Sequence, residues 1–266
     1  MSQETVSQTG RLHWDATSTD YLRHRPGYPD AFFALLQNLG IGLAGQDILD
    51  LGSGTGALAV PFARQKARVT AVDLSKGQIA AGQKAARQHH VSITFKVAPA
   101  EETGLPDLSF DVITASMCWA YFNQQRMARE VPRLLRPDGR LLVSTLIWSG
   151  AEDAIAGQTD RLLIKYNPKA RQLRRRGESE IIPRWSVSAY RLLTYHEFTV
   201  TLPFTRESWR GRMRATKWIG AALSPEQTAA FDREHQTLLN RIAPPTFDIR
   251  HRITLHIFQP IKSNIG

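Results

Sequence analysis

The residues with the clearest chemical character form the run DLGSGTG at positions 50–56, in which an acid precedes three glycines. Glycines permit a tight turn and let a ligand lie against the backbone. Their G-x-G-x-G spacing differs from the G-x-G-x-x-G of dinucleotide sites, and the sequence lacks the Gly-Lys-Ser/Thr of a Walker loop. Asp50 would repel a pyrophosphate but would attract an ammonium group. The run therefore argues against an NAD-dependent oxidoreductase and indicates a ligand with a positively charged end.

A second acid, Asp73, follows Asp50 by 23 positions and closes the next predicted strand. A carboxylate at such a strand end can accept hydrogen bonds from both hydroxyls of a ribose. Leu74, directly after it, could pack on a purine ring. The glycine run and the two acids together point to a nucleoside that carries an amino group.

Alternating strands and helices must position these residues. The apolar spacing predicts helices at 29–40, 57–66, 75–90 and 124–135, and strands at 46–52, 67–73, 91–97, 110–116 and 141–148, the last after a turn at 136–140. Apolar strands that alternate with helices indicate right-handed crossover units and a parallel sheet that is buried on both faces. The expected class is therefore α/β.

The alternation ends after Trp148, where the sequence becomes basic and helical. We expect residues 150–190 to form a helical, basic cap that is inserted between strands. Late strands at 195–204 and 247–258, with helices near 206–218 and 224–241, would complete the sheet. The sequence is thus divided into three predicted parts. Residues 1–149 contain the N-terminal segment and the ligand site, residues 150–190 form the cap, and residues 191–266 complete the sheet. The predicted sheet has seven strands and is mostly parallel, with one antiparallel late strand.

Four segments carry a family resemblance: DILDLGSGTG, VTAVDLS, APAEETGLPDLSFDVITA and LLRPDGRLLVS. Together they resemble the class I S-adenosylmethionine-dependent methyltransferases, and among these the type 11 methyltransferases, over roughly residues 14–150. The resemblance implies a Rossmann-like sheet with helices on both faces. It also implies an enzyme that transfers a methyl group from S-adenosylmethionine to a small-molecule acceptor and releases S-adenosylhomocysteine.

The resemblance also implies roles for individual residues around the cofactor. The methionine end would bind at Asp50, Gly52, Ser53 and Gly54, the ribose at Asp73, and the adenine at Leu74, Ala100 and Glu101, with Ser116 near the amino-acid part. The family often has an aspartate before the Ala-Glu pair, where this chain has Pro99. Proline offers neither a polar side chain nor an N–H, so the adenine contact would fall to the backbone of Ala100.

The N-terminal segment YLRHRPGYP at 21–29 resembles the family's lid. By this resemblance, Tyr21 and Arg25 would close over the carboxylate and sulfonium side of the cofactor. The alternative is a surface helix that Pro26 ends. Within the same segment, His24 is the histidine best placed to act as a catalytic base.

The acceptor side is expected after the fourth strand, in the run SMCWAYF at 116–122. Trp119, Tyr121 and Phe122 could form the wall of an acceptor pocket, with Tyr121 as a second catalytic candidate. The family often has a histidine after the tryptophan, but Ala120 stands there, so a base role cannot be transferred. The alternative for the three aromatic residues is packing of the turn between strand and helix.

Composition narrows the class of protein further. The chain has 266 residues, of which 42% are hydrophobic and 22% charged, which excludes disordered, collagenous and coiled-coil proteins. Cys118 is the single cysteine, so an internal disulfide and a cysteine-based zinc site are excluded. The eight histidines show no metal-ligand spacing, and we predict no metal. A polar N-terminus and the absence of any long apolar run in the sequence predict a cytoplasmic protein without a membrane partner.

Basic charge is concentrated in the second half. Residues 1–150 carry 15 basic and 13 acidic side chains, and residues 151–266 carry 19 and 11. The cations Arg171, Arg174, Arg175, Arg176, Arg206, Arg210, Arg212, Arg214 and Lys217 occur with Trp185, Trp209 and Trp218 nearby. Such a surface could hold RNA, attract an anionic small molecule or simply be solvated. The alternatives to a small-molecule methyltransferase are therefore an RNA methyltransferase and a non-catalytic S-adenosylmethionine-binding module. The sequence leaves the oligomeric state open.

Overall fold

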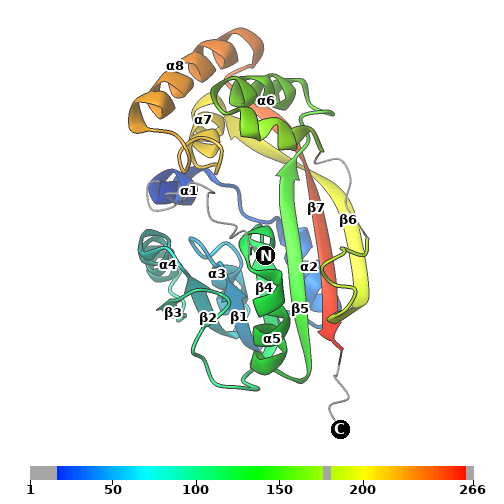
Figure 1. Cartoon of the computed structure of the whole chain (residues 1–266). Coiled ribbons are helices and arrows are strands. Elements are labelled where there is room, and N and C mark those ends of the chain that lie inside the picture. The colour runs from blue at the N-terminus through cyan, green and yellow to red at the C-terminus, as the bar shows by residue number, and fades with distance from the viewer. Residues whose placement is uncertain (1–16, 176–180, 262–266) are drawn as a thin grey trace, which may run out of the picture.

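A seven-stranded sheet forms the centre of the molecule (Figure 1). The computed structural model describes residues 17–175 and 181–261, with side chains omitted at 18 and 172–175. The strands are β1 (Asp47–Leu51), β2 (Arg68–Asp73), β3 (Thr94–Val97), β4 (Phe110–Ser116), β5 (Leu135–Trp148), β6 (Tyr190–Thr205) and β7 (Thr246–Pro260). They lie in the order β3-β2-β1-β4-β5-β7-β6, and β7 runs antiparallel to both of its neighbours. The predicted α/β class, with a mostly parallel sheet and one antiparallel late strand, is confirmed.

Helices cover both faces of this sheet. The flanking helices are α2 (Asp30–Asn38), α3 (Ala59–Arg64), α4 (Lys76–Gln88) and α5 (Gln124–Leu134). Ile48 of β1 belongs to the apolar cluster formed with α2 and α3, whereas the next residue, Leu49, belongs to the cluster formed with α5. Both side chains are completely buried. Successive residues of β1 therefore face two different cores, which explains why the strand reads as an unbroken apolar run.

The start of β5 differs from the predicted turn at 136–140. Phe110 of β4 pairs with Leu135, but Val112 pairs with Arg140, so the four residues 136–139 of β5 lie opposite the single residue Asp111. Arg136 holds this irregularity through ion pairs of 2.8 Å to Asp47 and 2.7 Å to Asp111. The turn residues are therefore absorbed into a bulged strand of 14 residues, Leu135–Trp148.

A group of helices lies beyond the carboxyl ends of the parallel strands (Figure 1). It comprises α6 (Ala154–Tyr166), η3 (Pro168–Arg175), α7 (Arg206–Arg214) and α8 (Pro225–Ile242), which we call the cap. Its own apolar core includes Leu163, Trp209 and Phe231, all completely buried. The cap extends beyond the predicted 150–190 insertion, because α7 and α8 share one apolar core with α6 and with the ends of β5, β6 and β7. The predicted basic side chains at 174–176 lie outside the described residues.

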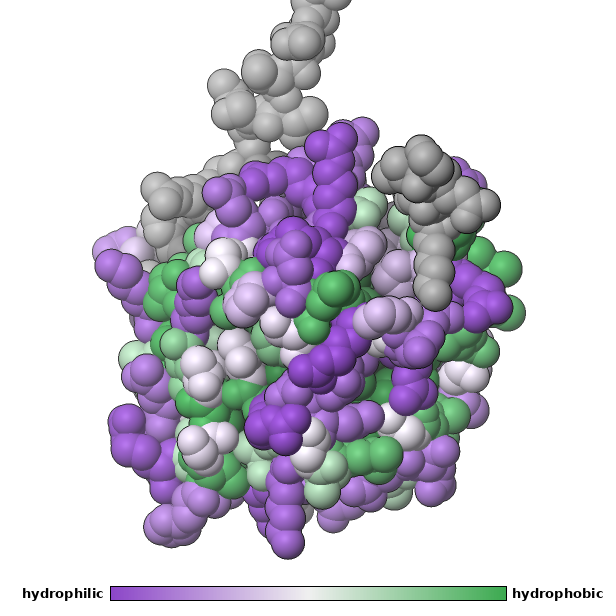
Figure 2. Space-filling view, turned by 90° about the horizontal axis from the view of Figure 1, so that it is seen from below, coloured by the Kyte–Doolittle hydropathy of each residue, from purple (hydrophilic) through white to green (hydrophobic). Residues whose placement is uncertain are grey.

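The opposite end of the sheet is shown in Figure 2. Hydrophilic residues cross this face, and hydrophobic ones lie between them. In the part of the chain that the structure describes, no helix is long and apolar enough to cross a membrane.

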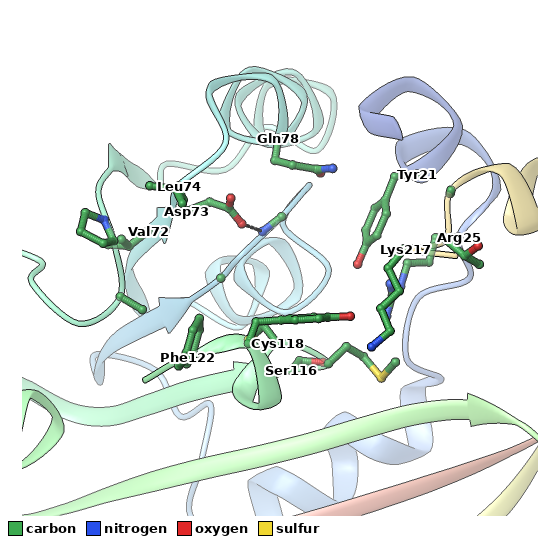
Figure 3. A pocket seen from close by; sticks show the side chains of 18 of the residues that line it. Tyr21, Arg25, Val72, Asp73, Leu74, Gln78, Ser116, Cys118, Phe122 and Lys217 are labelled. Atoms are coloured by element: carbon green, nitrogen blue, oxygen red, sulfur yellow. Dashed lines mark hydrogen bonds between the residues drawn. The ribbon is translucent and has the colours of Figure 1, made fainter. Parts of the chain in front are cut away.

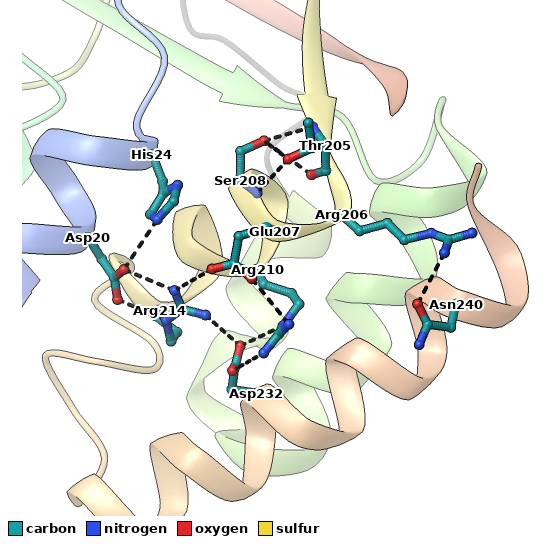
Figure 4. Close-up of polar contacts among 10 residues, drawn as sticks. All are labelled: Asp20, His24, Thr205, Arg206, Glu207, Ser208, Arg210, Arg214, Asp232 and Asn240. Carbon is teal, nitrogen blue, oxygen red and sulfur yellow. Dashed lines mark hydrogen bonds and ion pairs between the residues drawn. The ribbon is translucent and has the colours of Figure 1, made fainter. Parts of the chain in front are cut away.

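An ion-pair network joins the cap to the N-terminal helix α1 (Ser18–His24), as Figure 4 shows. Arg214 of α7 contacts Asp20 of α1 at 2.9 Å and Asp232 of α8 at 2.7 Å. Arg210 also pairs with Asp232. Burial raises the pKa of Asp232, but hydrogen bonds from Arg210 and Arg214 outweigh it and hold the pKa below its ordinary value. The network therefore fixes α1 to the cap through groups that are mostly shielded from water.

We predict that Asp232→Asn destabilises the protein by about 1–3 kcal/mol, because it leaves two arginines without their shared carboxylate. Glu152→Gln is the control, since Glu152 makes a 3.7 Å pair with Arg250 in which both side chains are about half exposed. Such a surface pair contributes below about 1 kcal/mol. Urea unfolding measures both, and equal effects of the two substitutions would contradict the network's role.

Stability should also fall in acid because of two buried histidines. Burial lowers the pKa of His235 and of His251 to about 4, against about 6.5 in the unfolded chain. The unfolded chain therefore binds protons first. The contribution of each histidine to the free energy of unfolding should be constant above pH 6.5 and should fall toward pH 4 by about 1.4 kcal/mol per pH unit. The raised pKa of Asp50, about 7, acts in the opposite sense over this range, so the test compares the slope of wild type with the slopes of the variants.

Urea unfolding at pH 7.5, 6 and 5 measures this slope. His235→Gln should make the slope shallower, whereas His89→Gln, at an exposed position, should leave it unchanged. A slope that is the same in wild type and His235→Gln would rule out His235 as a source of the acid sensitivity.

Candidate functional site

A cavity lies between the carboxyl ends of the strands, helix α1 and the cap (Figure 3). Fifteen residues were predicted as catalytic, cofactor-binding or acceptor-pocket residues. Eleven of them line the cavity, namely Tyr21, Arg25, Gly52, Gly54, Asp73, Leu74, Ala100, Glu101, Ser116, Tyr121 and Phe122. Four others, His24, Asp50, Ser53 and Trp119, are not among the described residues that line this cavity. The folding of the sheet and the docking of α1 thus bring together residues that are far apart in the sequence.

The glycine turn at the end of β1 is built by two left-handed residues. Gly52 has φ of 59° and Gly54 has φ of 55°. A Cβ atom on Gly52 would lie 2.8 Å from the Cβ atom of Cys118, so a larger residue would collide with the segment after β4. Gly52 is therefore required for close packing of the protein itself, as well as for the turn.

Asp73 connects this turn to the end of β2. Its carboxylate accepts hydrogen bonds of 2.8 Å from the backbone N–H groups of Gly54 and Ser75. Ser75 also caps α4 by accepting a hydrogen bond from the Gln78 N–H. The carboxylate is consequently held in one orientation at the cavity wall, where Figure 3 shows it.

An apolar surface lies next to Asp73. Leu74 lines the cavity although 73% of its surface is exposed, and the buried residues Ala98 and Ala100 lie in the same lining. Glu101 is held at the edge, because its carboxylate accepts a hydrogen bond from the Asn123 N–H at 2.8 Å. A carboxylate next to an exposed apolar side chain matches the two halves of a nucleoside, which has a polar ribose and a flat base.

A small polar recess lies below the glycine turn. Its lining includes Asp50, Ser53 and Ser116, together with Tyr21 and Arg25 of α1. Burial raises the pKa of Asp50 to about 7, even though Thr114 donates a hydrogen bond of 2.7 Å to its carboxylate. The hydroxyl of Ser53 is buried and has no hydrogen-bond partner among the residues that the structure describes. A buried acid beside an unsatisfied hydroxyl is suited to an ammonium group that enters from the cavity.

Tyr28 also lines this recess, and the sequence did not predict it as a site residue. Its hydroxyl is hydrogen-bonded to Ser116 at 2.8 Å and to Ser144 at 3.1 Å. Burial raises the pKa of Tyr28 to about 12, so the phenol is neutral at physiological pH. Tyr28 belongs to the YLRHRPGYP segment, which was singled out only for its lid residues.

Tyr21 and Arg25 reach the cavity from α1. The Arg25 guanidinium lies 4.5 Å from the centre of the Tyr21 ring, a cation–π contact that holds the two side chains together. Tyr21 lies on α1 and Arg25 directly follows this helix, and Figure 3 shows both side chains at the cavity. Both residues also line the recess that contains Asp50 and Ser53.

His24 lies on the other side of α1. Its ring packs so closely on α7 that a Cβ atom on Gly211 would come within 2.1 Å of it, and its Nε2 atom lies 3.6 Å from Asp20 (Figure 4). Burial lowers the pKa of His24. The predicted catalytic role for His24 is therefore replaced by a packing role, because the helix turns this side chain to the cap.

The aromatic run after β4 separates into two environments. Trp119 is buried in the core formed with α5, where its ring centre lies 4.7 Å from that of Trp185. Tyr121 and Phe122 line the cavity, and Tyr121 is 45% exposed. Trp119 was predicted as a pocket wall, but it packs the turn between strand and helix, which was the stated alternative.

The far end of the cavity is formed by residues that sequence reasoning did not assign to a pocket. They are Trp148 at the end of β5, Arg212 on α7 and the segment 215–218 after α7. Arg212, Lys217 and Trp218 had been noted only as part of a basic region with interleaved tryptophans. That pattern was the available signal, but the fold was needed to place it opposite the glycine turn.

The geometry agrees with comparisons to known proteins. The family model described as a methyltransferase domain matches residues 49–143. A ubiquinone/menaquinone biosynthesis C-methyltransferase of Vibrio vulnificus is 37% identical over 105 residues, which are 37% of this chain and 40% of that protein. The chain therefore spans less than half the length of that curated relative.

Solved structures show the same fold over most of the chain. A putative type II methyltransferase from Anaeromyxobacter dehalogenans has a TM-score of 0.59 at 24% identity and covers 88% of this chain and 96% of its own. A Haemonchus contortus phosphoethanolamine N-methyltransferase, solved with S-adenosylhomocysteine, has a TM-score of 0.50 at 17% identity. The match covers 92% of this chain and 57% of that chain. Residues 49–143 therefore match the methyltransferase-domain family, and the chain around them has the fold of solved structures that are named as methyltransferases.

Proposed function

We propose that this chain transfers the methyl group of S-adenosylmethionine to a small-molecule acceptor and releases S-adenosylhomocysteine. The observation that carries the proposal is a single cavity with two chemically different ends. One end has Asp73 beside the exposed Leu74, and the other has aromatic and basic side chains of the cap. A donor and an acceptor would therefore meet inside one cavity.

The residues at the first end fit this cofactor. Asp73 would accept hydrogen bonds from the ribose, Leu74 would pack on the adenine, and Asp50 with Ser53 would hold the ammonium group. The buried, unpartnered hydroxyl of Ser53 supports this fit, because such a group requires a partner. Tyr21 and Arg25 would hold the carboxylate. When bound, the cofactor supplies a methyl group on a positively charged sulfur.

The protein's own contribution would be alignment and exclusion of water. In-line displacement needs the acceptor atom close to the methyl carbon and in line with the bond that breaks. Helix α1 and the cap cover the cavity from one side, and the Arg214 ion pairs hold them together. We propose that Tyr121 orients the acceptor, since its half-exposed phenol lines the cavity and the centre of its ring lies 5.0 Å from the Lys217 ammonium.

The RNA methyltransferase alternative receives less support from the cap. Arg210 and Arg214, which contribute to its basic character, make ion pairs with Asp232, and Arg214 also pairs with Asp20. Their charges are therefore engaged in ion pairs that join the cap to helix α1.

We predict that Asp73→Ala lowers the affinity for S-adenosylhomocysteine by about tenfold to a hundredfold, because hydrogen bonds to a charged group are each worth about 1.5–3 kcal/mol. Asp138→Ala removes an exposed carboxylate from the β5 bulge and is the matched control. Calorimetric titration measures both, with NADH as a decoy ligand. Equal affinity of the Asp73 variant and wild type, or binding of NADH, would contradict the assignment.

Cofactor affinity should also depend on pH through Asp50. With a pKa of about 7, this carboxyl is largely protonated at pH 6, and binding an ammonium group favours its ionised form. Affinity for S-adenosylhomocysteine should therefore rise from pH 6 to pH 7.5, by up to about tenfold per unit. Asp50→Asn should remove this dependence. Calorimetry at the two pH values tests it, and a pH-independent affinity in wild type would show that Asp50 does not face the ammonium group.

A further inference from the structure

Two cationic side chains of the cap line the acceptor end of the cavity. The Arg212 guanidinium lies 5.0 Å from the centre of the Trp148 ring, and only 4% of Arg212 is exposed. The Lys217 ammonium lies 5.0 Å from the centre of the Tyr121 ring and 4.4 Å from that of Trp218. Figure 3 shows Lys217 extending into the cavity beside Arg25.

The aromatic rings give these cations fixed positions. A cation over a ring face is attracted by the ring's quadrupole, and this contact leaves its positive charge in place. In a cavity with apolar walls, a charge acts over a longer distance than in water. Arg212 and Lys217 therefore contribute positive potential at the acceptor end.

The acids of the cavity lie at the other end. Asp73 is tied to the N–H groups of Gly54 and Ser75, and Glu101 is tied to that of Asn123. Both acids are therefore fixed beside the proposed nucleoside. Among the described residues that line the cavity, both acids thus lie at the nucleoside end, whereas two of the three cations, Arg212 and Lys217, come from the cap side.

We propose that the methyl acceptor carries an anionic group, a carboxylate or a phosphate, that binds to Arg212 and Lys217, while its apolar part contacts Trp148 and Trp218. This inference rests on the proposed function and deepens it by assigning the substrate class. A guanidinium pairs with two oxygens of such an anion at once, and an ammonium adds a compact third contact. Arg25 is assigned to the cofactor, because it directly follows α1 and lines the recess with Asp50 and Ser53.

The test uses simple probes on the protein saturated with S-adenosylhomocysteine. Benzoate, phenyl phosphate and the neutral benzamide are titrated by calorimetry, so that carboxylate, phosphate and uncharged forms of one ring are compared. At least one anion should bind about tenfold or more tightly than benzamide, which corresponds to about 1.4 kcal/mol. The anion that binds more tightly, benzoate or phenyl phosphate, shows whether the site prefers a carboxylate or a phosphate.

Matched variants locate the anion. Lys217→Met keeps the length of the side chain and should weaken anion binding about tenfold, whereas Lys217→Arg should retain it. Lys84→Met, at an exposed position on α4, should change nothing. The affinity for S-adenosylhomocysteine should be the same in the wild type and in Lys84→Met, and each Lys217 variant is saturated with it according to its own measured affinity.

Several results would overturn the proposal. These are equal binding of benzamide and the anions, binding of neither anion, or an unchanged anion affinity in Lys217→Met. Tighter binding of a uridine decanucleotide than of either small anion would assign the cations to a polymer instead. If wild type fails to bind S-adenosylhomocysteine, the proposed function fails, and the same titrations without it still decide whether the anion site exists.

Discussion

The arrangement of the cavity depends on the contacts of Arg214. This guanidinium lies between Asp20 of the N-terminal helix and Asp232 of the cap, two residues more than 200 positions apart. It is only 18% exposed, so its ion pairs are less screened than those at the surface. Because of them, α1 and the cap lie together above the strand ends. Tyr21 and Arg25 consequently face the same space as Arg212 and Lys217.

The sheet supplies the other half of the cavity by different means. Its strands are buried on both faces, and packing of the two cores fixes where each strand ends. Asp73 then joins the end of β2 to the glycine turn after β1 through two backbone hydrogen bonds. The apolar sheet therefore positions Asp73 and the glycine turn at the cofactor end, and the ion-pair network positions the cap at the acceptor end. Methyl transfer would require both to be in place at once.

The sequence was most informative where function depends on local backbone geometry. The glycine spacing, Asp50 and Asp73 lie within 24 residues, and the structure places them around one turn and one recess. The acceptor end was much harder to foresee, because Arg212 and Lys217 approach the cavity only after α7 has packed on α1 and α6. His24 and Trp119 show the same limit. Their types suit a site, but the direction of each side chain is set by Gly211 and Trp185, which are distant in sequence.

The central claim is that one cavity holds the cofactor on the sheet and presents its sulfur to the cap. A crystal structure of the protein with S-adenosylhomocysteine tests this most directly. We expect the ribose hydroxyls on Asp73, the adenine on Leu74, the amino group near Asp50 and Ser53, and the sulfur directed toward Tyr121 and Lys217. A ligand bound at another surface, or one whose ribose does not contact Asp73, would contradict the account.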